Sequence, residues 1–173
     1  MAARKSDSFF IRVTKDLGNT NTYHEKAISL GPFVDVLDKS VLRIHNIEVA
    51  FTDNTGRSNV ISAAAAAQFQ LLTQSQTDIV LPSNRSVVAS GRVNVNAGIL
   101  AGNLPIWVGN TLDVGPQHWT NGYLVATENL YLGGSASTGF DGDVYCTVIL
   151  ECTVEKMDTQ AGMALALSQQ GAN

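Results

Sequence analysis

The two cysteines, Cys146 and Cys152, are the residues of this sequence best suited to chemistry, because a thiol can pair, bind metal or act as a nucleophile. They lie in the stretch DVYCTVILECTVEK, residues 143–156, whose apolar and polar residues alternate. Strict alternation predicts a β-strand with both cysteines on its apolar face. Six residues of strand span roughly 20 Å, whereas a disulfide needs Cα atoms within about 7 Å. We therefore expect two free thiols buried in the core.

The other motifs that could carry chemistry are incomplete. The loop GGSASTGF has Gly134 and Gly139 at phosphate-loop spacing, but Phe140 stands where such a loop requires Lys. Asp141 and Asp143 lack the remaining ligands of a calcium loop. Both motifs are therefore interpreted as turns.

The three histidines show no metal-ligand spacing, and no Cys–His pair is expected because both cysteines point into the core. Folding could still bring an acidic side chain near a histidine. The sequence nevertheless predicts a protein without catalytic residues, metal, cofactor or small-molecule substrate. The residues considered on this point are His24, His45, His118, Asp35, Asp38 and Glu48.

The surface is predicted to be poor in charge. Lys, Arg, Asp and Glu make up 15% of the 173 residues, against about 25% in an average soluble domain. Interface cores are depleted in charged residues, so this composition favours a protein that buries its surface against copies of itself. A monomer with a neutral polar surface is the alternative. The net charge of −4 argues against a protein that binds nucleic acid over its whole surface.

The chain is predicted to be all-β: an eight-stranded antiparallel jelly-roll sandwich or barrel. An immunoglobulin-like sandwich is less favoured because it has seven strands and a Cys…Trp…Cys pattern. In the third segment of the list below, residues 39–53, the alternation changes phase near His45–Asn46, which predicts a β-bulge. Residues 60–66 are interpreted as a helical or irregular lead-in to the next strand, and residues 97–120 as a long irregular stretch. The eight predicted strands lie within residues 8–16, 23–31, 39–53, 67–74, 77–82, 86–98, 121–134 and 143–156.

The segments outside the strands supply candidates for contacts. Long loops in compact domains are often functional, and exposed aromatic residues there would act as anchors. The alternative is that the tryptophans plug the end of the sandwich. Asp158 is the predicted N-cap of a short C-terminal helix. We predict a flexible N-terminal arm at 1–7, one domain at 8–156 and a tail at 157–173. The interface candidates are Ile106, Trp107, Trp119, Met163, Leu165 and Leu167, and the arm carries Arg4 and Lys5.

The segments SFFIRVTKD, VLRIHNIEVAF, SVVASGRVNV and DVYCTVILECTVEK together resemble the framework strands of single jelly-roll major capsid proteins of tailless icosahedral viruses. This resemblance implies a self-assembling shell subunit located in the virion and made in the host cytoplasm. It implies copies of the chain and other capsid proteins as partners. The arm has only two basic residues, which favours an internal viral membrane or another protein beneath the shell over direct contact with the genome.

Two other functions stay open at this stage. One is a carbohydrate- or ligand-binding β-sandwich that uses aromatic residues as stacking platforms, namely Trp107, Trp119, Tyr123 and Tyr131. The other is a phage tail-tube protein or another virion structural protein, which would form rings or tubes instead of closed shells.

Overall fold

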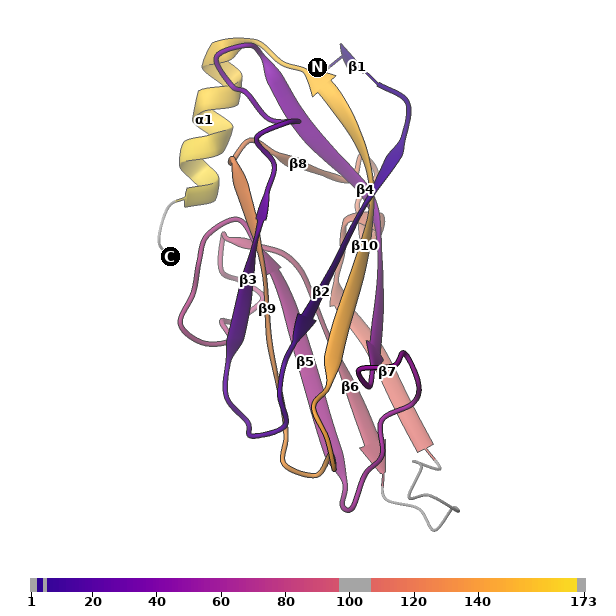
Figure 1. Ribbon diagram of the computed structural model, residues 1–173. Coiled ribbons are helices and arrows are strands. Elements are labelled where there is room, and N and C mark those ends of the chain that lie inside the picture. Colours follow the sequence, from indigo (N-terminus) through magenta and orange to yellow (C-terminus); the bar gives the residue numbers. More distant parts are fainter. Residues whose placement is uncertain (1–2, 5, 97–106, 171–173) are drawn as a thin grey trace.

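The chain folds into a sandwich of two antiparallel sheets (Figure 1). The computed structural model describes residues 3–4, 6–96 and 107–170. In chain order, the elements of these ranges are β1 (Ala3–Arg4), β2 (Phe9–Asp16), β3 (His24–Ser29), β4 (Ser40–Thr52), β5 (Ala65–Leu72), β6 (Val87–Asn96), β7 (Trp107–Val114), the 3-10 helix η1 (Pro116–His118), β8 (Tyr123–Val125), β9 (Asn129–Ala136), β10 (Tyr145–Lys156) and α1 (Thr159–Gln170).

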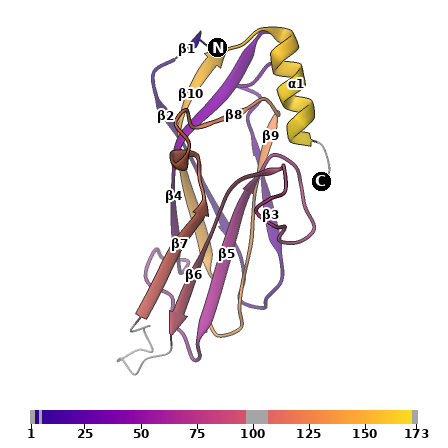
Figure 2. The same ribbon diagram turned by 180° about the vertical axis from the view of Figure 1, so that it is seen from behind.

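The strand order is that of a jelly roll. Sheet A has the order β2–β10–β4–β8, and the two-residue strand β1 pairs with the end of β10. Sheet B has the order β3–β9–β5–β6–β7, with β7 at its edge (Figure 2). Without β1 and β7, each sheet keeps four strands, and the chain passes repeatedly between the sheets in the double Greek key of a jelly roll. The predicted all-β fold is confirmed.

A β-bulge falls where the sequence predicts it. In the ladder between β4 and β10, Asn46 pairs with Glu151 and Ile44 pairs with Cys152, so His45 is the extra residue. The bulge restores the phase of the alternation, because a one-residue shift would otherwise turn every later side chain to the other face. Ile44 and Ile47 are therefore both buried, although they have opposite parity in the sequence.

The predicted strand at 77–82 is wrong. Within this segment the backbone of Val80 bonds to a side chain instead of to a neighbouring strand: its amide donates to Gln70 Oε1 at 2.9 Å, and its carbonyl accepts from Gln70 Nε2 at 2.5 Å. A single glutamine amide offers both a donor and an acceptor, and so can bond to a backbone as a strand residue does. These two hydrogen bonds hold the apolar run as a loop over the outer face of sheet B.

Two further segments differ from the prediction. Residues 121–134 were expected to be one strand, but the chain turns at 126–128 and divides into β8 in sheet A and β9 in sheet B. The stretch 97–120 was expected to be irregular, yet it contains β7 and η1. Gly109 and Asn110 are weak strand formers, so pairing with β6 decides the structure of β7 more than its own sequence does.

The core lies between the sheets. Phe69, on the inner face of β5, is 2% exposed, and its ring centroid lies 6.2 Å from that of Phe51 on β4. Cys146 and Cys152 are fully buried on the inner face of β10, as predicted. The inward side chains of strands from both sheets thus form a single apolar cluster.

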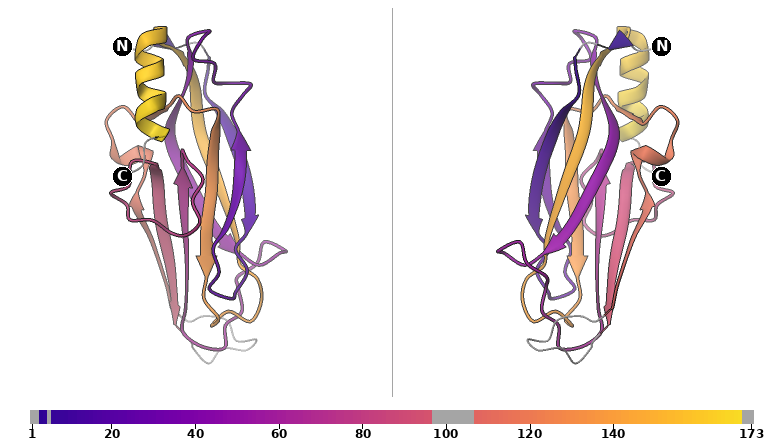
Figure 3. Two further views of the ribbon diagram at one scale, coloured as in Figure 1. Left: turned by 90° about the vertical axis from the view of Figure 1, so that its left-hand side faces the viewer. Right: turned by 90° about the vertical axis from the view of Figure 1, so that its right-hand side faces the viewer.

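Helix α1 covers one end of the sandwich, next to β8 (Figures 1 and 3). Its predicted cap is present, because the amide of Ala161 donates to Asp158 Oδ1 at 2.9 Å. Gly162 packs close to Val36: a Cβ at this glycine would lie 3.0 Å from Val36 Cγ1. Within the described residues, no helix has the length and apolarity that a membrane crossing requires.

Candidate interaction surfaces

Trp119 lies in a loop that is fixed to the edge of sheet A. The indole is 54% exposed. The carbonyl of Trp119 accepts from the amide of Gly122 at 3.2 Å. Gly122 has a φ of 65°, and a Cβ there would lie 2.3 Å from the carbonyl oxygen of Ile44, so this close approach requires glycine. The loop therefore holds Trp119 outward, and the alternative that this residue plugs the end of the sandwich is not supported.

The side chain of Gln117 completes the same edge. Its amide nitrogen donates to the carbonyl of Ile47 at 3.1 Å, and its oxygen accepts from the amide of Ile47 at 3.2 Å. Strand β8 pairs only with residues 42–44 of β4. At Ile47, farther along β4, the side chain of Gln117 therefore takes the place of a neighbouring strand. Beside it, a groove of about 250 Å³ lies between β4 and β7, lined in part by Val49, Phe69 and Leu112.

Helix α1 carries the second group of predicted contact residues. Gln169 fixes the helix: its side-chain oxygen accepts from the amide of Ala126 at 3.0 Å, and its carbonyl accepts from Thr73 Oγ1 at 2.6 Å. Met163 and Leu167 lie one turn apart and are 50% and 70% exposed, whereas Leu165 is half-buried. The structure thus leaves an apolar pair on the outer side of the helix.

The remaining predicted site residues are only partly described. Ile106 and Lys5 lie outside the described residues. Trp107 begins β7, and its backbone pairs with Asn96. Arg4 belongs to β1 and pairs with Glu155, so the predicted N-terminal arm includes a short contact with β10. Those of the predicted residues that the structure describes are not gathered into one site.

Three of the most strongly exposed apolar residues in the described ranges were missed by the sequence analysis. Leu37 is 79% exposed in the loop before β4, and Leu81 is 75% exposed in the loop between β5 and β6. Phe10 is 55% exposed on the outer face of β2. The alternation in SFFIRVTKD already places Phe10 opposite Phe9 and Ile11, so its position could have been recognised.

A polar cluster surrounds the bulge on the outer face of sheet A. Arg43 donates to both carboxylate oxygens of Glu155, at 2.5 and 2.9 Å, and also to the carbonyl of Asn121 in the Trp119 loop. His45 Nε2 and Thr153 Oγ1 lie 2.9 Å apart. Among the described residues, no three His, Cys, Asp or Glu side chains are grouped so that they could hold a metal ion. These bonds therefore join strands and fix a loop.

Burial keeps both thiols protonated. It raises the pKa of Cys146 from 9.0 to about 12. It also raises the pKa of Cys152 to about 12, with a smaller contribution from the charge of Glu151. Because the thiolate is the reactive form, neither cysteine can act as a nucleophile near neutral pH.

We expect neither thiol to react with Ellman's reagent at pH 8 while the chain is folded, and both to react once urea unfolds it. The folded pKa lies above the unfolded one, so the stability that the protonated thiols contribute is complete below pH 9. This contribution is lost as the pH rises from about 9 to 12, since the unfolded chain then releases protons that the folded chain retains. Rapid labelling of the folded chain would contradict the assigned burial.

No protein-family model matches the chain, and no curated protein matches it. Among solved structures, it is similar to the Merkel cell polyomavirus VP1 unassembled pentamer, with 10% identity over 89% of this chain and 98% of the other and a TM-score of 0.43. For turnip yellow mosaic virus the identity is 8%, the coverage 88% and 95%, and the TM-score 0.37. For Cocksfoot mottle virus the identity is 12%, the coverage 91% and 88%, and the TM-score 0.30.

Proposed function

We propose that this chain is a structural subunit of a viral capsid, which associates with copies of itself in the virion and carries out no catalysis. A jelly roll by itself does not determine a function. The observation that carries the proposal is that large apolar side chains stay exposed on several separate faces of a charge-poor molecule. These residues are Phe10, Leu37, Leu81, Trp119, Met163 and Leu167.

The density of charge supports burial between copies. The chain has an accessible surface of 8908 Å², and its 11 basic and 15 acidic residues amount to about one charge per 340 Å². A chain of this length with the average charged fraction of about 25% would have one per about 210 Å². Low charge with exposed aromatic and aliphatic anchors is the composition of protein interfaces.

The carbohydrate-binding alternative has less support. Tyr123 packs against the core from β8 in sheet A, and desolvation raises its pKa. Tyr131 is half-buried on β9 in sheet B. The two rings thus belong to different sheets, whereas a stacking platform needs aromatic faces on one exposed surface.

Other partners belong to this proposal as well. Arg4 and Lys5 would add only about 1 kcal/mol each toward an anionic lipid surface. This favours a shell in which contacts between proteins dominate, with a membrane or a second capsid protein beneath it.

Light scattering coupled to size exclusion tests the proposal, at rising protein concentration and at several salt concentrations. We expect multimers of defined size, followed by shells in electron micrographs. Open tubes would instead indicate the tail-tube alternative. A mass that stays at 18.4 kDa at every concentration would contradict the proposed function.

A further inference from the structure

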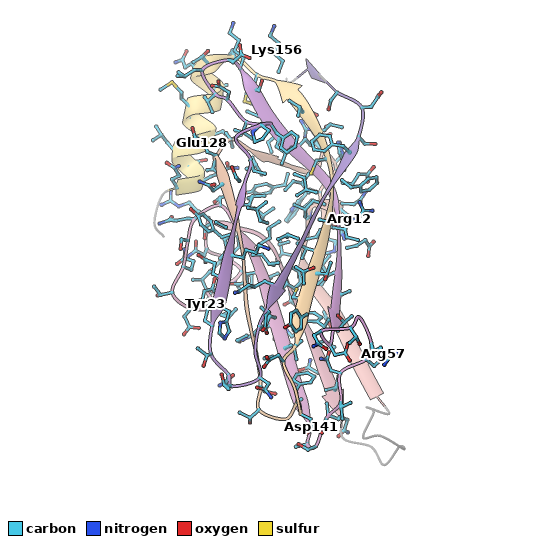
Figure 4. All side chains as sticks on the ribbon, in the orientation of Figure 1. Arg12, Tyr23, Arg57, Glu128, Asp141 and Lys156 are labelled. Carbon is cyan, nitrogen blue, oxygen red and sulfur yellow. The ribbon has the colours of Figure 1, made fainter. Side chains whose placement is uncertain are left out.

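The outer face of sheet A carries two opposite charges in one row across three strands. Ile149 on β10 pairs with Arg12 on β2 at one side and with Glu48 on β4 at the other. Their neighbours Ile11, Ile47 and Leu150 contribute to the core, so these three side chains point outward. Arg12 and Glu48 are exposed, and Ile149 between them is partly exposed. Figure 4 shows Arg12 beside β2 and β10.

The other polar groups nearby on this face are paired within the chain. The hydroxyls of Thr14 and Thr147 lie 2.8 Å apart, and Asn46 donates to Glu151 at 2.5 Å. The carboxylate of Asp16 raises the pKa of Tyr145 by its charge and by a hydrogen bond.

Arg12 and Glu48 differ from these groups. The guanidinium of Arg12 lies 5.4 Å from the centroid of the Phe10 ring and has no carboxylate partner among the described residues. Glu48 has no side-chain hydrogen bond or ion pair within the same ranges. Two exposed charges of opposite sign are thus available to an outside partner.

Around this row, the outer face of sheet A is also uncovered. The loop between β5 and β6 covers the outer face of sheet B, where Gln70 binds Val80 and Glu25 accepts from Ser75 Oγ at 2.5 Å and from the amide of Gln76 at 2.9 Å. Figure 3 shows β2, β10 and β4 at the outside of the molecule.

We propose that sheet A packs face to face on sheet A of a second copy of this chain. A two-fold axis parallel to β10, running between the two faces, exchanges the β2 side with the β4 side. It places Arg12 of each copy opposite Glu48 of the other and Ile149 against its own counterpart. Such a contact is isologous, so one row forms two ion pairs. The inference rests on the proposed function for its partner, a second copy.

The size of the face fits a weak contact that is repeated in an assembly. Three strands about 4.8 Å apart and eight residues at about 3.3 Å each give roughly 400 Å² per copy. Both copies together would bury about 800 Å², below the roughly 1,200 Å² of a stable specific interface. Other contacts are therefore needed for a stable particle.

Charge reversal tests the contact. We expect Arg12→Glu and Glu48→Arg each to weaken self-association at low salt by at least about tenfold, because each puts like charges opposite one another. An equal mixture of the two variants, and the double variant R12E/E48R, should both recover the association. Arg57→Glu is the control for Arg12→Glu: it makes the same change in net charge on the loop after β4, away from Arg12 (Figure 4).

A cross-link distinguishes face-to-face packing from edge-to-edge packing. Facing sheets lie about 10 Å apart, beyond the reach of a disulfide. We therefore expect Ile149→Cys to form covalent dimers with a short bismaleimide, while the wild-type chain, whose two thiols are buried, forms none.

Association that is indifferent to both single variants, or the absence of cross-linked dimers, would overturn the face-to-face contact. If shells still assemble in that case, the proposed function stands without the face-to-face contact. A wild-type chain that stays monomeric at every concentration would overturn both.

Discussion

Replacing Arg43 with Ala is expected to lower the free energy of unfolding by about 3–5 kcal/mol, the usual cost of removing one partner from a buried ion pair. The side chains of Arg43 and Glu155 are 14% and 9% exposed. After the change, the carboxylate of Glu155 would stay buried without its cation. The loop of Trp119 would also lose the hydrogen bond from Arg43 to Asn121. Urea denaturation monitored by circular dichroism measures the loss.

A second ion pair, which is more exposed, provides a matched control. Arg92 and Asp113 join β6 to β7 at 2.9 Å, but the Arg92 side chain is 52% exposed. Arg92→Ala should therefore cost no more than about 1 kcal/mol. Changing Arg43 and Glu155 together to Met should recover most of the loss, because no buried charge is then left unpaired. Equal losses for the two arginine variants would contradict the difference in burial.

The period of the hydrophobic pattern was sufficient to predict most of the sandwich. Alternation in residues 143–156 placed both cysteines in the core, and the phase change at His45–Asn46 located the bulge. Both inferences depend on a buried face, which fixes the parity of a strand. The local signal of Asp158 likewise predicted the start of α1.

The errors arose where pairing partners decide the structure. Residues 77–82 contain a short apolar run typical of a strand, but the side chain of Gln70, ten residues earlier in the chain, binds Val80 and holds the segment as a loop. Strand β7 forms because β6 offers its edge, and the turn at 126–128 sends β8 and β9 to different sheets. None of these features leaves a hydrophobic periodicity in the sequence from which it could have been predicted.

The candidate surfaces were predictable only in part. Trp119, Met163 and Leu167 were identified by residue type, and they are exposed. The row of Arg12, Ile149 and Glu48 could not be found, because its members are 36 to 137 residues apart in the chain and meet only through the register of β10 with β2 and β4. Register between strands is set by the whole sheet, and a single sequence does not specify it.

Replacing Phe69 with Ala is expected to cost about 3–5 kcal/mol, because it removes a large buried ring and leaves a cavity. Phe69 lies at the centre of the core, against Phe51 of the other sheet. Gly91 of the neighbouring strand provides space for the ring: a Cβ at this position would lie 2.7 Å from Phe69 Cε1. Rigid strands surround the site, so it cannot collapse around the smaller side chain. The midpoint of urea denaturation should fall with little change in the slope.

Phe10→Ala makes the same chemical change on the outer face of sheet A. Phe10 is 55% exposed and contacts Arg12 through its ring, so the loss in the monomer should stay within about 1 kcal/mol. The effects on self-association should be the reverse of the effects on stability. Self-association should weaken for Phe10→Ala and remain unchanged for the fraction of Phe69→Ala that stays folded. This reversal follows if β2 presents a contact face while β5 supports the core. Comparable losses of stability in the two variants would contradict that division.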